Sequence, residues 1–280
     1  MASYAAPILC ALFVWWFSTG VVLLIVGLPR RALPWGLSGA GVLFVAALYG
    51  LAVSSAVPSI AGAYFAFTCA ILVWGAQEIG FLTGAITGVR SMPCPEGCAG
   101  FRRARYAIEA ILYHEVALIL SGVAVAAVTW DGENQIGTWT FVILWTMRIC
   151  AKLNLFLRVP VLNAEFLPEH LRHLRSFFAR KPTNALFPIV VTVATAATTL
   201  ILALAMSAEA SPFEATGFSL LAALLALGVL EHWFMIVPLP IASLWSWGLR
   251  ARAPTVDRTA VSAVADDVAL RVAARNRLKP

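Results

Sequence analysis

Residues 61–84 read AGAYFAFTCAILVWGAQEIGFLTG and contain one charged side chain, Glu78. About 20 apolar residues in a helix cross a hydrocarbon core roughly 30 Å thick, so this stretch is long enough to span a membrane. Comparable apolar stretches recur on both sides of it. We therefore expect seven spans, near residues 7–27, 35–55, 61–84, 106–128, 138–157, 186–206 and 215–237.

The composition supports a membrane protein over a water-soluble one. Hydrophobic residues make up 61% of the chain and charged residues 12%, whereas a soluble domain has roughly 25% charged residues. The alternating polar pattern of a membrane β-barrel is missing, so the spans are expected to be helices. The sequence thus predicts an all-α polytopic integral membrane protein, with a seven-helix membrane domain over 1–249 and a polar tail over 250–280.

The loop charges predict the orientation of the chain. Basic residues follow the first, third, fifth and seventh spans, whereas the opposite loops hold only acidic ones, for example Asp131 and Glu214. By the positive-inside rule the basic loops are cytoplasmic, which places the amino terminus outside the cytoplasm and the carboxyl terminus inside it. The net charge of +6 reflects this topology, so membrane lipid is the expected partner and nucleic acid is not.

A cytoplasmic amphipathic helix is expected between the fifth and sixth spans, where Pro168 and Glu169 form a helix start. At about 100° per residue, its apolar residues gather on one arc and define an interfacial helix. His170 falls inside that arc and is expected to face inward, with Glu165 nearby at the interface. The apolar arc comprises Leu167, Leu171, Leu174, Phe177 and Phe178.

Cys94 and Cys98 form a Cys-x3-Cys pair in the loop after the third span. No second Cys/His pair lies nearby in sequence, so a zinc site is not expected. The loop is predicted to face the reducing cytoplasm, so a disulfide is not expected either.

Several ionisable side chains fall inside the predicted spans, where each costs about 2.5–3.5 kcal/mol on insertion scales. Their distances from the cytoplasmic ends, at the 1.5 Å helical rise, place them in a common layer roughly 8–14 Å deep. We expect four helices to share one polar chamber there. Its candidate residues are Glu78, His114, Glu115, Arg148, Lys152, Asn154, Glu231 and His232.

Three interpretations of this chamber remain open. The simplest is an internal ion-pair network, with Arg148 and Lys152 on one helix face neutralising nearby carboxylates. A second is ligation of a tetrapyrrole metal or a bare ion by an imidazole or carboxylate. A third, a proton or ion relay, is disfavoured because the chain shows no inverted repeat. The candidate ligands are His114, His170, His232, Glu78 and Glu231.

The spacing of these residues weakens the interpretation of the chamber as a di-iron centre. Such sites normally use Glu-x-x-His, which puts both ligands on one helix face. The chain instead has His114-Glu115 and Glu231-His232, whose members diverge by about 100°.

Several short stretches together resemble one family. They are Trp15-Trp16-Phe17-Ser18-Thr19-Gly20, Trp74-Gly75-Ala76-Gln77-Glu78-Ile79-Gly80-Phe81-Leu82-Thr83-Gly84, Tyr113-His114-Glu115, Lys152-Leu153-Asn154-Leu155-Phe156-Leu157, Glu165-Phe166-Leu167-Pro168-Glu169-His170-Leu171 and Leu230-Glu231-His232-Trp233-Phe234. In this order, from about residue 11 to about 249, they resemble the photosynthetic complex assembly protein 2 family, PuhE, of purple phototrophic bacteria.

The resemblance implies a membrane assembly factor for the photosynthetic reaction centre and its light-harvesting partner. It also implies contact with reaction-centre or light-harvesting subunits, and the handling of bacteriochlorophyll or another tetrapyrrole. The family brings no catalytic residue, so we expect a non-enzymatic role. The alternative is a membrane-embedded, metal-dependent oxidoreductase that uses His and Glu ligands, with iron as its cofactor, on a hydrophobic substrate.

Overall fold

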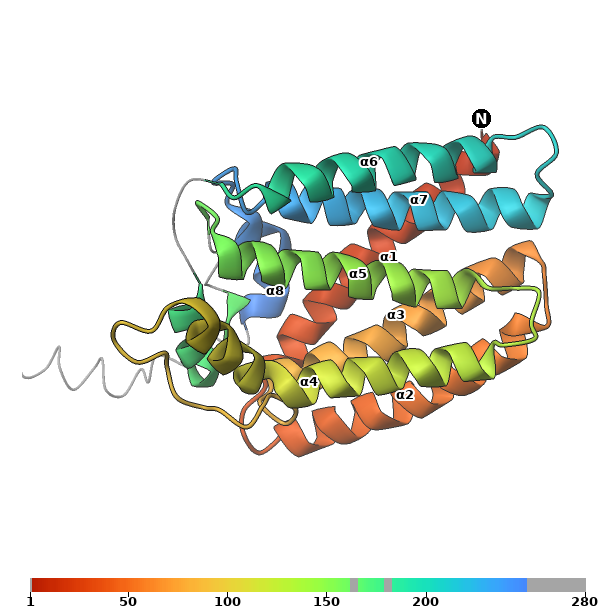
Figure 1. The fold of residues 1–280 in the computed structure, drawn as a ribbon. Coiled ribbons are helices and arrows are strands. Elements are labelled where there is room, and N and C mark those ends of the chain that lie inside the picture. Colours follow the sequence, from red (N-terminus) through yellow and green to blue (C-terminus); the bar gives the residue numbers. More distant parts are fainter. Residues whose placement is uncertain (1, 162–165, 179–182, 251–280) are drawn as a thin grey trace, which may run out of the picture.

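Seven long apolar helices make up most of the computed structural model, which describes residues 2–161, 166–178 and 183–250. Within those residues there is no β-strand, and the predicted all-α class with seven candidate membrane spans is confirmed (Figure 1). The long helices are α1 (Ala2–Val26), α2 (Leu33–Ser55), α3 (Ile60–Leu82), α4 (Gly100–Val128), α5 (Ile136–Leu157), α6 (Leu186–Ala205) and α7 (Pro212–Trp233).

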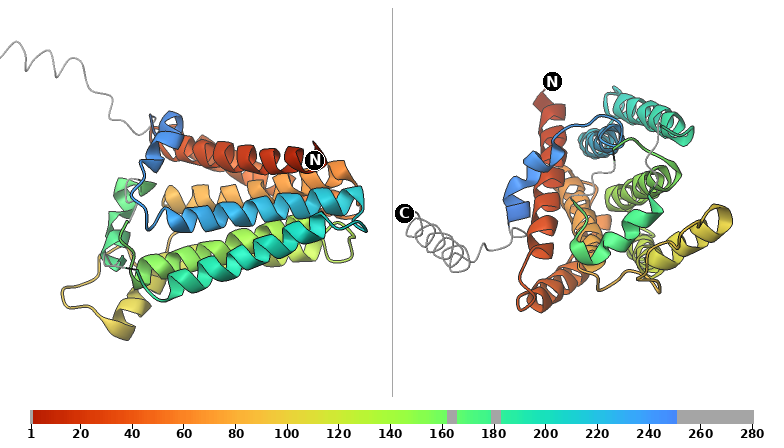
Figure 2. Two further views of the ribbon diagram at one scale, coloured as in Figure 1. Left: turned by 90° about the horizontal axis from the view of Figure 1, so that it is seen from above. Right: turned by 90° about the vertical axis from the view of Figure 1, so that its left-hand side faces the viewer.

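The largest difference from the predicted spans is at the start of α4, which begins at Gly100 rather than near residue 106. Hydropathy detects only the apolar part of a helix, whereas Arg102, Arg103 and Arg105 are good helix formers. They extend α4 beyond its apolar stretch. Both views in Figure 2 show these first turns reaching sideways from the bundle.

The helix ends follow from local side-chain chemistry. The Ser59 side chain accepts a hydrogen bond from the Gly62 N–H (3.0 Å) at the start of α3. Ser211 and Glu214 form a capping box at the start of α7, which satisfies backbone donors that a helix start leaves open. Beyond the end of α3, Gly84 adopts φ +84°, a left-handed conformation that favours glycine.

Helices α3 and α7 form the centre of the bundle, and the other five surround them (Figure 2). In each of these two helices 61% of the most apolar 18-residue stretch is buried, against 17–22% in the other five long helices. The outer helices therefore carry most of the exposed apolar surface, as expected of helices that contact lipid.

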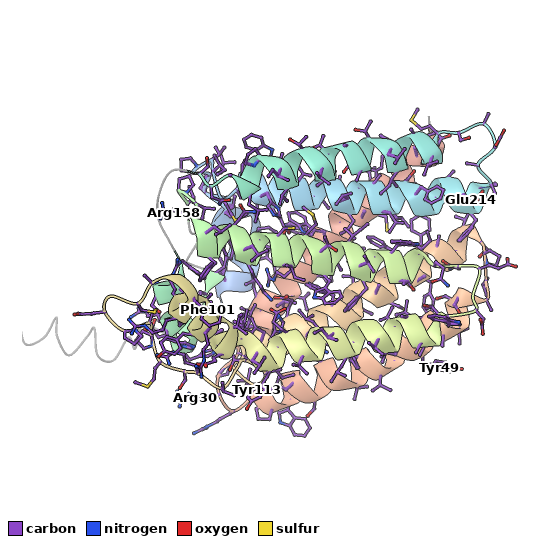
Figure 3. The ribbon with its side chains drawn as sticks, viewed as in Figure 1. Arg30, Tyr49, Phe101, Tyr113, Arg158 and Glu214 are labelled. Atoms are coloured by element: carbon purple, nitrogen blue, oxygen red, sulfur yellow. A yellow bond between two sulfur atoms is a disulfide. The ribbon has the colours of Figure 1, made fainter. Side chains whose placement is uncertain are left out.

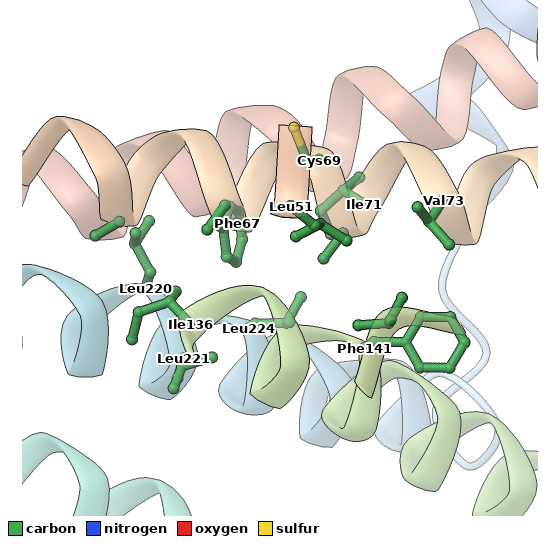
Figure 4. Packing of buried hydrophobic residues seen from close by; sticks show 14 of the residues in the cluster. Leu51, Phe67, Cys69, Ile71, Val73, Ile136, Phe141, Leu220, Leu221 and Leu224 are labelled. Atoms are coloured by element: carbon green, nitrogen blue, oxygen red, sulfur yellow. The ribbon is translucent and has the colours of Figure 1, made fainter. Parts of the chain in front are cut away.

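Close helix contacts hold the core together. The main cluster includes Leu51, Phe67, Phe141 and Leu220, all nearly inaccessible (Figure 4). At Gly217, an added Cβ would lie 2.3 Å from Ile136, so the glycine allows α7 to approach α5. Between lipid-embedded helices this contact contributes packing energy rather than hydrophobic transfer, since lipid is as apolar as leucine.

The two ends of the bundle differ in charge. Figure 3 shows Arg30 and Arg158 at one end and Glu214 at the other. We call these the basic end and the acidic end. The predicted separation of loop charges is thus present in the fold, while the orientation of either end in a membrane stays a prediction.

Short helices cover the basic end: η2 (Glu169–Phe177), η3 (Ile241–Trp245) and α8 (Ser246–Leu249). The last two pack on α1, where the Trp245 indole N–H donates to the Trp16 carbonyl (2.8 Å) and the Trp16 indole N–H donates to the Leu244 carbonyl (2.8 Å). This contact fixes the chain after α7 against the first helix.

The predicted amphipathic helix exists as η2, a 3-10 helix, and this changes the position of His170. At about 120° per residue, positions 171, 174 and 177 align on one face, and these three apolar side chains are buried against α3 and α4. His170 lies about 120° away and is exposed, so the inward orientation inferred from an α-helical period was wrong. Its ring still lies against Gly84.

The prediction for the cysteine pair was also wrong: Cys94 and Cys98 form a disulfide. A turn in which the Cys98 N–H donates to the Pro95 carbonyl (3.1 Å) brings the two Cα atoms to 6.1 Å. Two expectations lie outside the described residues, namely Glu165 as an interface residue and the polar tail after residue 250.

Candidate functional site

Charged side chains from four helices lie at one level of the bundle, near the basic end. Helices α3, α4 and α7 each supply a carboxylate, and α5 supplies two cations. We call this group the charged cluster. Its members are Glu78, Glu115, Arg148, Lys152 and Glu231.

The first ion pair joins α3 to α5. Arg148 Nη2 donates to Glu78 Oε2, and the Glu78 side chain is only 9% exposed. The other carboxylate oxygen, Glu78 Oε1, and the Arg148 Nε are buried without a hydrogen-bond partner among the described residues. The pair is therefore neutral but leaves one acceptor and one donor unsatisfied.

A second ion pair joins α4 to α5. Lys152 Nζ donates to Glu115 Oε1 at 2.5 Å, and both side chains are about three-quarters buried. Lys152 also interacts electrostatically with Arg148 and Glu78. The two pairs therefore form one electrostatic unit on a single face of α5, as the i, i+4 spacing of its two cations predicts.

The fifth member, Glu231, is anchored by a tryptophan. Trp15 of α1 donates its indole N–H to Glu231 Oε1 at 2.7 Å. Glu231 also interacts electrostatically with Arg148 and with Glu78. The edge of one ring packs on the face of the other between Trp15 and Trp245 of η3, with ring centroids 5.2 Å apart. This indole is a contact that sequence reasoning missed, because a deep tryptophan usually serves packing.

Glu231 is exposed although it lies on the interior face of α7. Leu227 and Leu224, one and two turns earlier on that face, are 4% and 3% exposed. Leu230 and Trp233, which mark the outward face, point away from it by roughly 100° or more. The Glu231 carboxyl group therefore lies between α7 and α1, whose Trp15 bonds it, at the level where the apolar core ends and the charged cluster begins.

His114 is enclosed beside the charged cluster. Its side chain is inaccessible, its ring packs on Phe81 with centroids 4.4 Å apart, and both ring nitrogens lack a partner within the described residues. Lys152 and Arg148 are close enough to interact with it electrostatically. A buried imidazole without a partner carries a desolvation penalty of about 1–3 kcal/mol.

His232 and Asn154 do not join the charged cluster. The His232 ring is 1% exposed and bonds through Nδ1 to the Gly228 carbonyl (2.8 Å) in its own helix. Asn154 donates to the Cys150 carbonyl (3.0 Å) and accepts from Asn184 (3.0 Å). Asn184 in turn accepts from the first backbone donors of α6, so Asn154 supports a helix end.

Three further polar atoms near the cluster lack partners within the described residues. They are Gln77 Oε1, next to Glu78 in α3, Trp145 Nε1, one turn before Arg148 in α5, and His232 Nε2, next to Glu231 in α7. Trp145 shares the face of Arg148 by its i, i+3 spacing. That spacing could have identified it in the sequence.

Arg103 holds η2 in place over the basic end of the bundle by hydrogen bonds to two backbone carbonyl groups. Its Nη2 donates to the Phe156 carbonyl (2.7 Å) and the Phe177 carbonyl (2.6 Å), and its guanidinium lies 4.1 Å from the Phe156 ring centroid. Within η2, burial lowers the pKa of His173, and the nearby His170 and Arg90 charges lower it further.

The residues that the structure describes do not bring three metal-ligating side chains together. The ligand set expected for a bare iron centre is therefore not assembled by residues 2–161, 166–178 and 183–250. A metal ion already held in a macrocycle would need only one further ligand atom from the protein, and a single histidine or carboxylate could supply it.

Comparisons with known proteins give a consistent result. Residues 1–256 match the family DUF3623, described as a protein of unknown function. A Rhodobacter capsulatus protein, described as an uncharacterized 30.4 kDa protein in the puhA 5′ region, is 40% identical over 251 residues, which cover 86% of this chain and 89% of the relative. No solved structure matches the chain significantly.

Proposed function

The chain belongs to the DUF3623 family, and from this premise we propose that it is an assembly factor for the photosynthetic reaction centre and light-harvesting complex. The observation that carries the proposal is the name of its 40% identical relative, which places that protein in the puhA 5′ region of Rhodobacter capsulatus. The resemblance of six ordered stretches to the PuhE family agrees with it.

The proposal includes handling of bacteriochlorophyll at the charged cluster. Seven apolar helices give access to hydrophobic molecules from the lipid. The cluster adds polar atoms without partners and an exposed carboxylate between helices. Such an arrangement suits a ligand with an apolar body and a polar or electropositive centre, because the buried polar groups then gain partners.

The alternative function, a metal-dependent oxidoreductase, has less support. Its proposed iron would need several protein ligands, and the described residues gather no group of three. Metal analysis of the purified protein separates the two functions, since stoichiometric iron supports the oxidoreductase and co-purifying pigment supports the assembly factor.

Deletion of the gene in its phototrophic host tests the proposal. We expect membranes of the deletion strain to lose most of the absorbance of the assembled complex and to recover it with the wild-type gene. Complementation by a variant with Glu133→Gln, an exposed loop residue at the acidic end, provides the matched control. Normal absorbance in the deletion strain would contradict the assembly role.

The proposed location is the bacterial inner membrane, with the basic end in the cytoplasm. Reporter fusions at residue 280 should be active in the cytoplasm, and fusions in the loop around Glu133 should be active in the periplasm. The reverse pattern would overturn the orientation while leaving the seven-helix fold intact.

A further inference from the structure

The charged cluster holds three carboxyl groups and two cations, so it is one positive charge short when all three carboxyl groups are ionised. Glu115 pairs with Lys152 and Glu78 pairs with Arg148, whose charge also interacts electrostatically with Glu231. In the described residues, Glu231 makes no ion pair within 4 Å. An ionised Glu231 without a counter-charge is costly at this depth in a membrane, so its carboxyl group holds a proton until a cation lies beside it.

Glu231 is also the one ligand candidate that a molecule entering the bundle could reach. His114 and His232 are 0% and 1% exposed, so their nitrogens are enclosed by packing. Glu78 is buried in its ion pair, and His170 lies outside on η2. Of these candidates, Glu231 alone combines an exposed carboxyl group with the lack of a paired cation among the described residues.

The carboxylate of Glu231 is held in one position. The Trp15 indole occupies Oε1, and the edge-on contact of Trp15 with Trp245 fixes the indole. Among the described residues no hydrogen bond reaches Oε2, which leaves that oxygen for an incoming partner. A ligand atom held by a fixed second residue is typical of a preorganised site.

We infer that Glu231 binds the hard positive centre of a hydrophobic ligand through its carboxylate. Two sources share this chemistry: a magnesium ion held in a tetrapyrrole, and an alkylammonium group. Magnesium prefers oxygen ligands, and inside a macrocycle it needs one from the protein, which the single accessible carboxylate supplies. The choice of magnesium as the positive centre rests on the proposed function. The lack of a paired cation for Glu231 is independent of that function.

Binding to the purified full-length chain in detergent micelles tests this inference, with tryptophan fluorescence as the readout. The probes are bacteriochlorophyll, its magnesium-free analogue bacteriopheophytin, dodecylammonium and magnesium chloride alone. For wild type we expect the magnesium-bearing pigment to bind about tenfold more tightly than the magnesium-free one, equivalent to about 1.4 kcal/mol. Glu231→Gln should reduce this preference to less than about twofold. Gln keeps an acceptor for the Trp15 N–H and so preserves the local fold, and Glu133→Gln is the control.

Each outcome has a definite meaning. A magnesium preference that survives in Glu231→Gln would overturn the inference while the pigment function stands. If wild type binds neither pigment but binds dodecylammonium, and Glu231→Gln abolishes that binding, the inference stands with ammonium as the source and the pigment function fails. Saturation by magnesium chloride alone would overturn the requirement for a hydrophobic ligand, as would equal binding of every probe by wild type and variant.

Discussion

The two halves of the bundle handle buried polar groups differently. Near the acidic end, the fully buried Asn134 bonds through its amide to the Ser54 carbonyl (3.1 Å) and accepts from the Ile136 N–H (3.2 Å). Toward the basic end, the equally buried His114 has both ring nitrogens unpartnered within the described residues, and Glu78 Oε1 and Arg148 Nε are likewise unpartnered.

Lipid surrounds both halves in the predicted arrangement, so the solvent does not explain the contrast. In folded proteins the great majority of buried polar groups are hydrogen-bonded, and each exception needs a reason. Among the described residues, the buried side-chain nitrogen and oxygen atoms of the acidic-end half have hydrogen-bond partners. Its helices also pack closely at Gly217, which favours stability. The half at the basic end has buried donors and acceptors without partners among the described residues, beside the exposed Glu231 carboxyl group. We therefore propose the structural role for the acidic-end half and the binding role for the basic-end half.

Breaking the ion pair between α3 and α5 should have the largest effect. Arg148→Met leaves the Glu78 carboxylate buried without its cation, and we expect a loss of about 3 kcal/mol in the free energy of unfolding. Chemical unfolding in detergent micelles measures it. The double variant Glu78→Leu/Arg148→Met removes both charges and should recover most of the loss. If Arg148→Met alone were as stable as wild type, the pair would not support the fold.

Overpacking the acidic-end half should have the next largest effect. Gly217→Val puts a Cβ 2.3 Å from Ile136, and the strain should lower the free energy of unfolding by about 1–3 kcal/mol. Gly41→Val on α2 is the matched control, since nothing lies within 4 Å of its Cβ position. Pigment binding per folded molecule should stay unchanged. Equal stability of the two variants would show that this helix contact is loose.

Most of the fold could be predicted because the membrane imposes simple rules. Apolar length identified all seven helices, and loop charge identified the two ends. Errors arose where another rule took over. The start of α4 was predicted six residues late because helix propensity, and not hydropathy, determines where it begins. His170 was misplaced because η2 repeats every three residues, a period that the sequence does not distinguish from the α-helical one.

Within the candidate site, depth was predictable and partner choice was not. Matched depth placed Glu78, Glu115, Arg148 and Lys152 at one level, but which carboxylate each cation chooses depends on helix rotation. His232 has a similar depth to Glu231, yet about 100° of rotation takes it out of the charged cluster. The role of Trp15 required the packing of α1 against α7, which local sequence does not specify.

Replacing His114 should separate stability from function. His114→Phe removes two unpartnered polar atoms beside Phe81, so the free energy of unfolding should rise by about 1 kcal/mol. Complex assembly in a complemented deletion strain should stay at the wild-type level, because packing encloses both removed nitrogens and keeps them from a ligand. Thermal unfolding and membrane absorbance measure the two effects. A destabilised variant would mean that His114 has a structural partner, and a loss of assembly would place His114 in the binding site.

The smallest expected effect is a pH dependence of the stability of η2, the short helix over the basic end. Burial lowers the pKa of His173 below its ordinary value of 6.5, and the charges of His170 and Arg90 add to this, while a backbone hydrogen bond with His170 opposes it. Folded η2 therefore favours the neutral imidazole of His173, and the same imidazole takes up a proton more readily when η2 is unfolded. Its stabilising contribution is complete above about pH 6.5 and declines as the pH falls from there toward the lower folded-state pKa. Amide hydrogen exchange of residues 169–177 should accordingly quicken between pH 7.5 and pH 5.5, after correction for the intrinsic rate. His173→Gln should remove the change while α3 keeps its protection at both pH values, and an unchanged pH response in that variant would assign the effect to another group.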